Sequence, residues 1–79
     1  MITPTEVEAR FAETGLITVL RFAWQGRKHP VTSHGRQWDT PDGRHLLVMT
    51  PDERIFELVY DPTHSRWHIA HAPDDRQAA

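Results

Sequence analysis

The chain has 79 residues, no cysteine and a formal net charge of −2 at pH 7. A chain of this length forms one domain that buries only about 60% of the surface exposed by its unfolded form. Disulfides and thiolate metal sites are excluded, and the net charge argues against a general polyanion binder. We expect a cytoplasmic protein, because no apolar run approaches the ~20 residues that cross a membrane and no secretory leader opens the chain.

The first segment fits two patterns. Residues 3–6, Thr-Pro-Thr-Glu, are typical of a capped helix start. The following residues alternate, with Val7, Ala9 and Phe11 between charged neighbours, as in a half-buried strand. We favour the strand, because residues 12–15 resemble a hairpin turn and another strand follows at once.

Residues 16–24 predict a strand rich in β-branched and aromatic side chains. Both of its faces are partly apolar, which favours a central strand or a closed barrel: Leu20, Phe22 and Trp24 on one face, Ile17 and Val19 on the other. Gln25-Gly26 predicts a tight turn that pairs Trp24 with Arg27 and Phe22 with His29. Pro30 cannot donate a ladder hydrogen bond, so the returning strand should be an edge strand or bulged.

The stretch from Arg36 to Ile69 predicts an antiparallel meander. Turn chemistry recurs at residues 40–44, 50–54 and 61–66, where proline and aspartate lie together. The registers expected from these turns put one set of apolar side chains on a single face, and a slip of one residue would break it. The expected pairs are Trp38 with Leu46, Arg36 with Val48, Val48 with Phe56, Leu46 with Leu58, Tyr60 with Trp67, and Leu58 with Ile69.

The predicted fold is therefore all-β, a five- to six-stranded antiparallel meander curled into a small barrel or half-barrel. One domain should span residues 1–71, and the small polar residues 72–79 should fray. The expected core is Phe11, Leu20, Phe22, Val31, Trp38, Leu46, Val48, Phe56, Leu58, Trp67 and Ile69.

Several of these features resemble a small uncharacterised bacterial domain. They are the run 22–27 with Val31 and Trp38, the segments 43–45 and 56–58, and the pairs Asp61-Pro62 and Arg66-Trp67. That family occurs alone and at the C-terminal end of degenerate mutagenesis proteins related to Y-family polymerases. It has no established catalytic residues. The chain departs from it at His29, where the family often has an aromatic, and lacks its tryptophan-rich acidic insert after Trp38.

Catalytic and metal sites are not expected. His64 and His68 straddle a predicted turn, and His68 and His71 should point to opposite faces, whereas zinc needs three or four convergent ligands. Neither serine lies in a nucleophile elbow, and Asp61 is better explained as a turn cap. No cofactor or metal is predicted, and we expect no enzyme.

Two binding hypotheses remain. The preferred one is a non-catalytic binding or adaptor module with a protein partner, through the second face of the meander at Leu47, Met49, Ile55 and Val59. Ile17 and Val19 could join this face, and the segment around residues 7–11 could fold over it. We favour a monomer over a homodimer across the face.

The alternative is a single-stranded nucleic-acid-binding module, linked through the resemblance to the DNA-damage response. Residues 16–49 carry five basic against two acidic side chains, and eight of the nine basic residues are arginine. Arginine binds phosphates and stacks on bases, as tryptophan also can. The candidate contacts are Trp24, Arg27, Lys28, Arg36 and Arg44.

Overall fold

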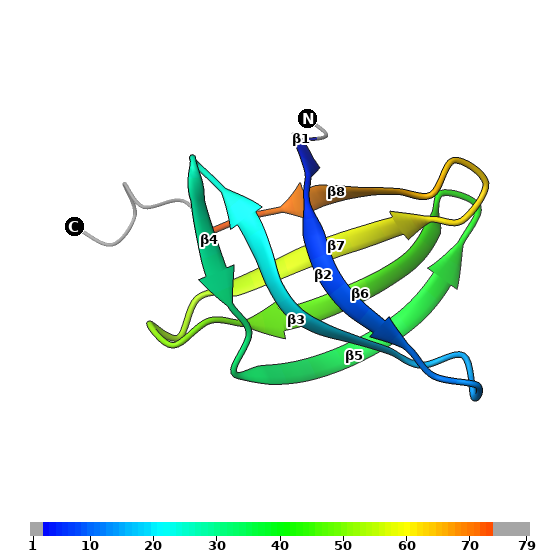
Figure 1. Cartoon of the computed structure of the whole chain (residues 1–79), viewed down its shortest axis with the longest axis horizontal. Coiled ribbons are helices and arrows are strands. Elements are labelled where there is room, and N and C mark those ends of the chain that lie inside the picture. The colour runs from blue at the N-terminus through cyan, green and yellow to red at the C-terminus, as the bar shows by residue number, and fades with distance from the viewer. Residues whose placement is uncertain (1–2, 74–79) are drawn as a thin grey trace.

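A computed structural model describes residues 3–73, and every regular element in this range is a strand (Figure 1). Eight strands form two antiparallel sheets, with the orders β1-β8-β7-β6-β5 and β2-β3-β4. The predicted all-β class is confirmed, although the strands form no closed barrel. The bounds are β1 (Thr3–Thr5), β2 (Val7–Phe11), β3 (Ile17–Trp24), β4 (Arg27–Pro30), β5 (Ser33–Thr40), β6 (Gly43–Met49), β7 (Ile55–Asp61) and β8 (Arg66–His71).

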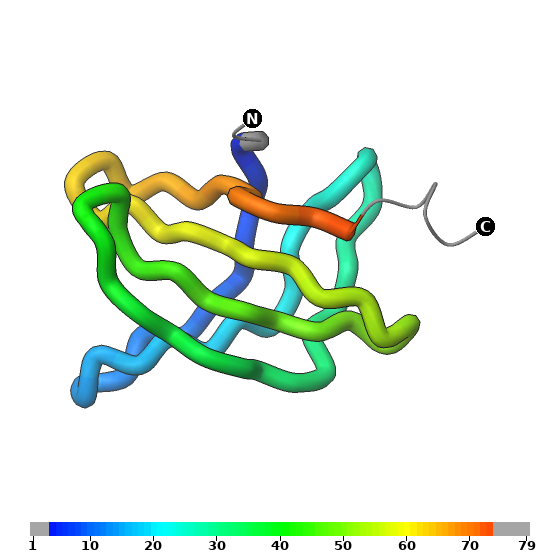
Figure 2. Tube along the Cα trace, turned by 180° about the vertical axis from the view of Figure 1, so that it is seen from behind, coloured from blue at the N-terminus to red at the C-terminus, as the bar shows by residue number. Residues whose placement is uncertain are grey.

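The smaller sheet crosses one face of the larger sheet, and the core lies between them (Figures 1 and 2). Burial of apolar side chains between two sheets is the main stabilising term in such a small domain. No segment within residues 3–73 crosses the other face of the larger sheet, which Figure 2 presents to the viewer. The buried cluster contains Ile17, Val19, Phe22, Leu46, Val48, Phe56, Leu58 and Ile69.

The N-terminal segment is extended, so the predicted strand is confirmed and the helix alternative is wrong. Its first part, β1, pairs with β8, with Thr5 opposite Trp67. The chain passes to the other sheet at Glu6, whose carbonyl accepts a hydrogen bond from the Ala23 N–H. Its second part, β2, then pairs with β3.

Most of the predicted hairpin registers are confirmed. The turn at Gln25-Gly26 pairs β3 with β4 as expected, and both turn residues have positive φ, as a type I′ turn requires. β4 lies at the edge of its sheet, consistent with Pro30. The confirmed pairs in the meander are Val48 with Phe56, Leu46 with Leu58, Leu58 with Ile69, and Tyr60 with Trp67.

The β5–β6 turn is one residue shorter than predicted, and this moves Trp38 out of the core. Thr40 pairs with Gly43, so Trp38 lies opposite His45 instead of Leu46. A Cβ on Gly43 would overlap the backbone of Tyr60 on β7. Gly43 therefore belongs to the sheet and not to the loop. Only glycine fits this position, where φ is +137°. A shift of one residue reverses the faces of a strand, so the prediction of Trp38 as a core residue is wrong.

A bulge then restores the alternation of β5. Gly35 and Arg36 together oppose Leu47, so Gln37 lies opposite Leu46 and His34 opposite Val48. The expected pairing of Arg36 with Val48 is therefore wrong. An extra residue in one strand of an antiparallel pair shifts the faces of everything beyond it. The bulge turns the His34 and Gln37 side chains toward the smaller sheet.

Side chains connect the two sheets where no backbone pairing joins β5 to β3. The Gln37 amide donates to the Ile17 carbonyl at 2.6 Å and accepts from the Ile17 N–H at 3.3 Å. The Nε2 atom of His34 lies 3.0 Å from the Val19 nitrogen and 3.1 Å from its carbonyl oxygen. The Gln37 amide satisfies both backbone groups of Ile17, whereas the single Nε2 atom of His34 satisfies one group of Val19, the N–H when it accepts or the carbonyl when it donates. The two sheets are therefore joined at β3 and β5 by side chains and not by a backbone ladder.

A second bulge corrects the expected faces of β3. Glu8 pairs with Arg21 and Ala9 with Val19, which leaves Leu20 as the extra residue. Before Leu20 the odd-numbered residues of β3 face the core, and after Leu20 the even-numbered residues do. Ile17 and Val19 lie in the core and not on the second face, while Leu20 is 36% exposed.

Two further expectations fail at the N-terminal segment. Phe11 was expected in the core, but it is 57% exposed. The segment around residues 7–11 does not fold over the second face of the meander, because it belongs to the sheet that packs on the first. The second face therefore remains uncovered within residues 3–73.

The two ends of the chain extend beyond the part that can be described. Ala72 is half-buried and packs against the core. The rest of the tail that we expected to fray, residues 74–79, lies outside the described residues. The described residues contain no helix that is long and apolar enough to cross a membrane.

Candidate binding surface

The candidate surface is the side of the larger sheet that faces away from β2, β3 and β4, which we call the outer face. The register places Trp38, His45, Val59 and His68 in one row across four strands. The next rows pair Leu47 with Glu57 and Met49 with Ile55. The outer face therefore has a polar half and an apolar half.

The polar half is built around His45, which is 9% exposed. Its Nδ1 atom lies 2.8 Å from Glu57 Oε2, and its Nε2 atom lies 2.7 Å from Thr40 Oγ1. The Trp38 ring stacks on the imidazole, with 5.2 Å between ring centroids, and the Arg36 guanidinium lies 5.2 Å from the centroid of Trp38. Both nitrogens of a buried imidazole are thus satisfied.

A hydroxyl, an imidazole and a carboxylate in this order also occur in nucleophilic hydrolases. Here Thr40 Oγ1 accepts a hydrogen bond from the Asp42 N–H at 3.1 Å, as the residue that caps a turn. The hollow beside Thr40 is not lined by His45 or Glu57. The arrangement is well suited to holding β5, β6 and β7 together, and the sequence analysis did not foresee it. The sequence gives only a weak indication of this arrangement, because His45 and Glu57 are diagonal neighbours on adjacent strands and not directly opposed residues.

The apolar half gathers three of the residues predicted to contact a partner. Leu47, Met49 and Ile55 line a hollow of about 180 Å³ beside the Gly35 bulge. Ile55 is 52% exposed. Val59, the fourth predicted contact, is fully buried between its neighbours, so it supports the surface from beneath and offers no contact area.

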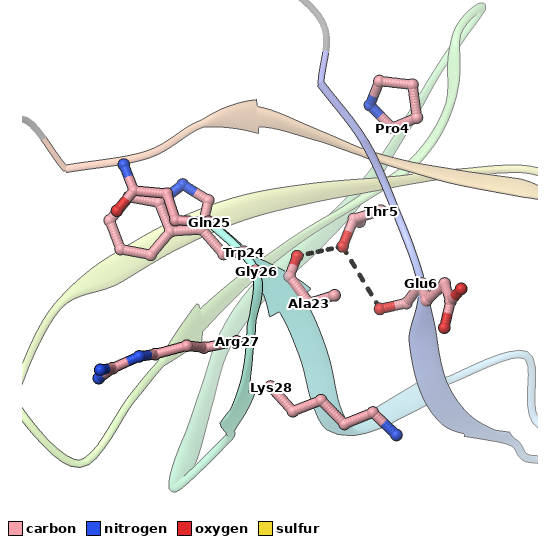
Figure 3. Close-up of a pocket in the computed structure, with 9 residues that line it drawn as sticks. All are labelled: Pro4, Thr5, Glu6, Ala23, Trp24, Gln25, Gly26, Arg27 and Lys28. Carbon is pink, nitrogen blue, oxygen red and sulfur yellow. Dashed lines mark hydrogen bonds between the residues drawn. The ribbon is translucent and has the colours of Figure 1, made fainter.

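The residues proposed to contact nucleic acid fall into separate groups. Trp24, Arg27 and Lys28 line one shallow depression of about 580 Å³ at the β3–β4 hairpin. Figure 3 shows that Arg27 and Lys28 extend to opposite sides of this hairpin. Arg36 lies on the outer face, over Trp38.

Trp24 is half-buried and packs into the end of the core. Its ring meets Phe56 edge-on at 4.9 Å and lies 5.4 Å from the His29 ring. The Arg54 guanidinium lies 5.7 Å from the Trp24 ring centroid. Part of the Trp24 indole therefore packs against the core, and the rest is accessible to solvent beside cationic side chains.

Arg44 is engaged by neighbours within the protein. It contacts Asp39 through two hydrogen bonds, of 2.6 and 3.2 Å, and also donates to the Gly15 carbonyl at 3.1 Å. The hydrogen bond from the Arg44 guanidinium holds the pKa of the Asp39 carboxyl below its usual value. Arg44 would have to give up these contacts to bind a phosphate.

Within residues 3–73, no three histidine, aspartate or glutamate side chains cluster as a metal ion would require. No family model, curated protein or solved structure matches the chain.

Proposed function

We propose that the chain is a non-catalytic binding module whose outer face docks a protein partner. The observation that supports this most strongly is the apolar half of that face. Leu47, Met49 and Ile55 lie together around a hollow, and nothing within residues 3–73 covers them. Contiguous apolar patches on a small domain typically mark interaction sites.

The polar half of the outer face favours the same function. His45 is hydrogen-bonded to both Glu57 and Thr40, so these side chains would not lose partners when water leaves. Trp38 lies over them as a half-buried aromatic side chain, the type that is enriched among binding hot spots. A surface that is already ordered loses less conformational entropy on binding.

Two further considerations support an adaptor inside a cell. The absence of cysteine is compatible with a reducing cytoplasm. The bacterial domain that the sequence resembles occurs alone and at the C-terminal end of larger proteins, and it has no established catalytic residues. A cytoplasmic adaptor fits both considerations.

Site-specific crosslinking tests this proposal. A photoreactive amino acid would replace Ile55 on the outer face and, as a control, Leu16 in the turn between β2 and β3. The two side chains are 52% and 57% exposed, respectively, so they are matched for access. We expect a discrete protein adduct from position 55 in extracts of the source cells, and none from position 16. Equal labelling from both positions would refute the outer face as the docking surface.

We propose single-stranded nucleic-acid contact as the alternative, at the β3–β4 hairpin. It is supported by the partly accessible Trp24 ring beside Arg27 and Lys28. Fluorescence anisotropy with a labelled oligonucleotide should then show binding that weakens steeply with salt, and Arg27→Ala should reduce it. A flat titration at low salt would dispose of this alternative.

A further inference from the structure

Within residues 3–73, the outer edge of β2 is an unpaired strand edge. The Ala12 N–H bonds to the Leu16 carbonyl and the Ala23 N–H bonds to the Glu6 carbonyl. In an antiparallel ladder, residues alternate between facing the partner strand and facing away from it. These two bonds therefore turn the N–H and C=O groups of Val7, Ala9 and Phe11 away from β3. Their side chains point inward, since these residues oppose core positions of β3.

Aromatic side chains lie beside this edge. Phe11 meets the Tyr60 ring at 5.1 Å and the Trp67 ring at 6.5 Å, and Tyr60 and Trp67 are 5.0 Å apart. Hollows of about 480 and 370 Å³ lie on the two sides of this cluster. In Figure 1 the ends of β7 and β8 extend past β2 on its free side, so the smaller sheet stops short of covering the larger one.

Two arginines flank the free edge of β2. Arg10 lies on the outward face of β2, and Arg66 lines the hollow between β1, β2 and the start of β8. Within residues 3–73 neither forms an ion pair, whereas Arg21 on the neighbouring strand contacts Glu8 at 3.2 Å. Acidic groups on a ligand would complement both arginines.

We propose that β2 accepts an extended peptide as a fourth strand of the smaller sheet. The peptide backbone would bond to the outward groups of Val7, Ala9 and Phe11, as in other cases of strand addition. Its apolar side chains would lie on Tyr60 and Trp67, and its alternate acidic side chains would face Arg10. This site is separate from the outer face, so it goes beyond the function proposed above.

A single strand fits this edge better than a second copy of the chain. The ends of β7 and β8 project beneath the free side of β2 (Figure 1), where a folded copy would collide with them. The other edge of the smaller sheet, β4, is a poorer acceptor. It contains Pro30 at an outward position, where no N–H is offered.

The test uses a fluorescent peptide that alternates aspartate with valine and phenylalanine, and a matched peptide with lysine in place of aspartate. We expect the wild-type chain to prefer the aspartate peptide. NMR hydrogen exchange should show that the Ala9 and Phe11 amides become protected when it binds. Absence of binding, or binding without this protection, would overturn the proposal.

Matched proline variants sharpen the test. Ala9→Pro removes an outward N–H that no strand uses, so we expect a folded chain that binds the aspartate peptide about tenfold more weakly. Lys28→Pro makes the same change on the edge of β4 and should bind like wild type. If Ala9→Pro does not fold, Arg10→Glu provides the second readout and should reverse the preference toward the lysine peptide. Equal binding by all variants would contradict the proposal, as would a wild-type dimer that Ala9→Pro dissociates.

Discussion

At the scale of single residues, His45 is the side chain whose role could least be foreseen. It is buried on a face that the sequence analysis treated as the lesser one, and it is held by Glu57 and Thr40. A buried polar group costs free energy unless its hydrogen bonds are made. The three side chains therefore stabilise the sheet only as a set.

Removal of the imidazole should leave Glu57 without its partner. We expect His45→Ala to lower the free energy of unfolding by about 2 kcal/mol, the order typical of an orphaned buried group. The control is His71→Ala, since His71 is exposed and its loss should cost less than about 0.5 kcal/mol. Urea denaturation of both variants measures the difference. Equal stability of the two would mean that the network contributes nothing.

At the scale of elements, the all-β class and the antiparallel pairing could be predicted, but the number of strands, eight where five or six were expected, and the two bulges could not. Turn residues and alternation were enough for the β3–β4, β6–β7 and β7–β8 hairpins. Leu20 and the pair Gly35-Arg36 form the bulges; Leu20 has no local chemistry that distinguishes it from an ordinary strand position, and Gly35 is of a residue type that often marks a bulge but does not fix its register. Their effect extends along the strand and reverses which side chains face the core.

The same limit applies to the candidate site. Leu47, Met49 and Ile55 could be grouped from the β6–β7 register, because that turn is unambiguous. Trp38 could not be assigned to the outer face, because its position depends on whether Gly43 belongs to the loop or to the strand. The Tyr60 backbone decides this, and a contact between strands is invisible in local sequence.

The connection between the sheets is also an element-scale feature with a testable consequence. We expect Gln37→Leu to leave the Ile17 N–H and C=O unpaired and to lower the free energy of unfolding by about 1–3 kcal/mol. The Ile17 amide should then exchange its hydrogen faster, while the Phe22 amide in the same strand should change little. Unaltered exchange at Ile17 would show that the Gln37 side chain does not act as a surrogate strand.

At the scale of the whole molecule, three surface carboxyls link stability to pH. Side-chain hydrogen bonds lower the pKa values of three carboxyls. The main donors are Arg44 to Asp39, Thr50 to Asp52 and His64 to Asp61. A carboxyl with a lowered pKa in the folded state stabilises the fold above its unfolded pKa, near 3.9 by rough average. That contribution disappears as the pH falls through the folded value.

We therefore expect the free energy of unfolding to fall as the pH drops below about 4. Because all three carboxyls lie at the surface, added salt should reduce the effect. Denaturation at a series of pH values measures it, and a variant with asparagine at positions 39, 52 and 61 should have a flatter acid limb. If the free energy of unfolding of that variant falls with acid as steeply as that of wild type, other groups cause the pH dependence.

The outer face is the feature on which the proposed function depends, and a matched pair of charge substitutions tests it most directly. Met49→Asp places a carboxylate in the apolar half of the face, while Leu20→Asp places one on the smaller sheet, where Leu20 is already exposed. The measurement is capture of the protein that crosslinks to position 55, with light scattering to define the mass of each variant. We expect both variants to be folded monomers, Met49→Asp to lose the partner and Leu20→Asp to keep it. Retention of the partner by Met49→Asp, or unfolding of Met49→Asp while wild type is monomeric, would show that the outer face is not the docking surface.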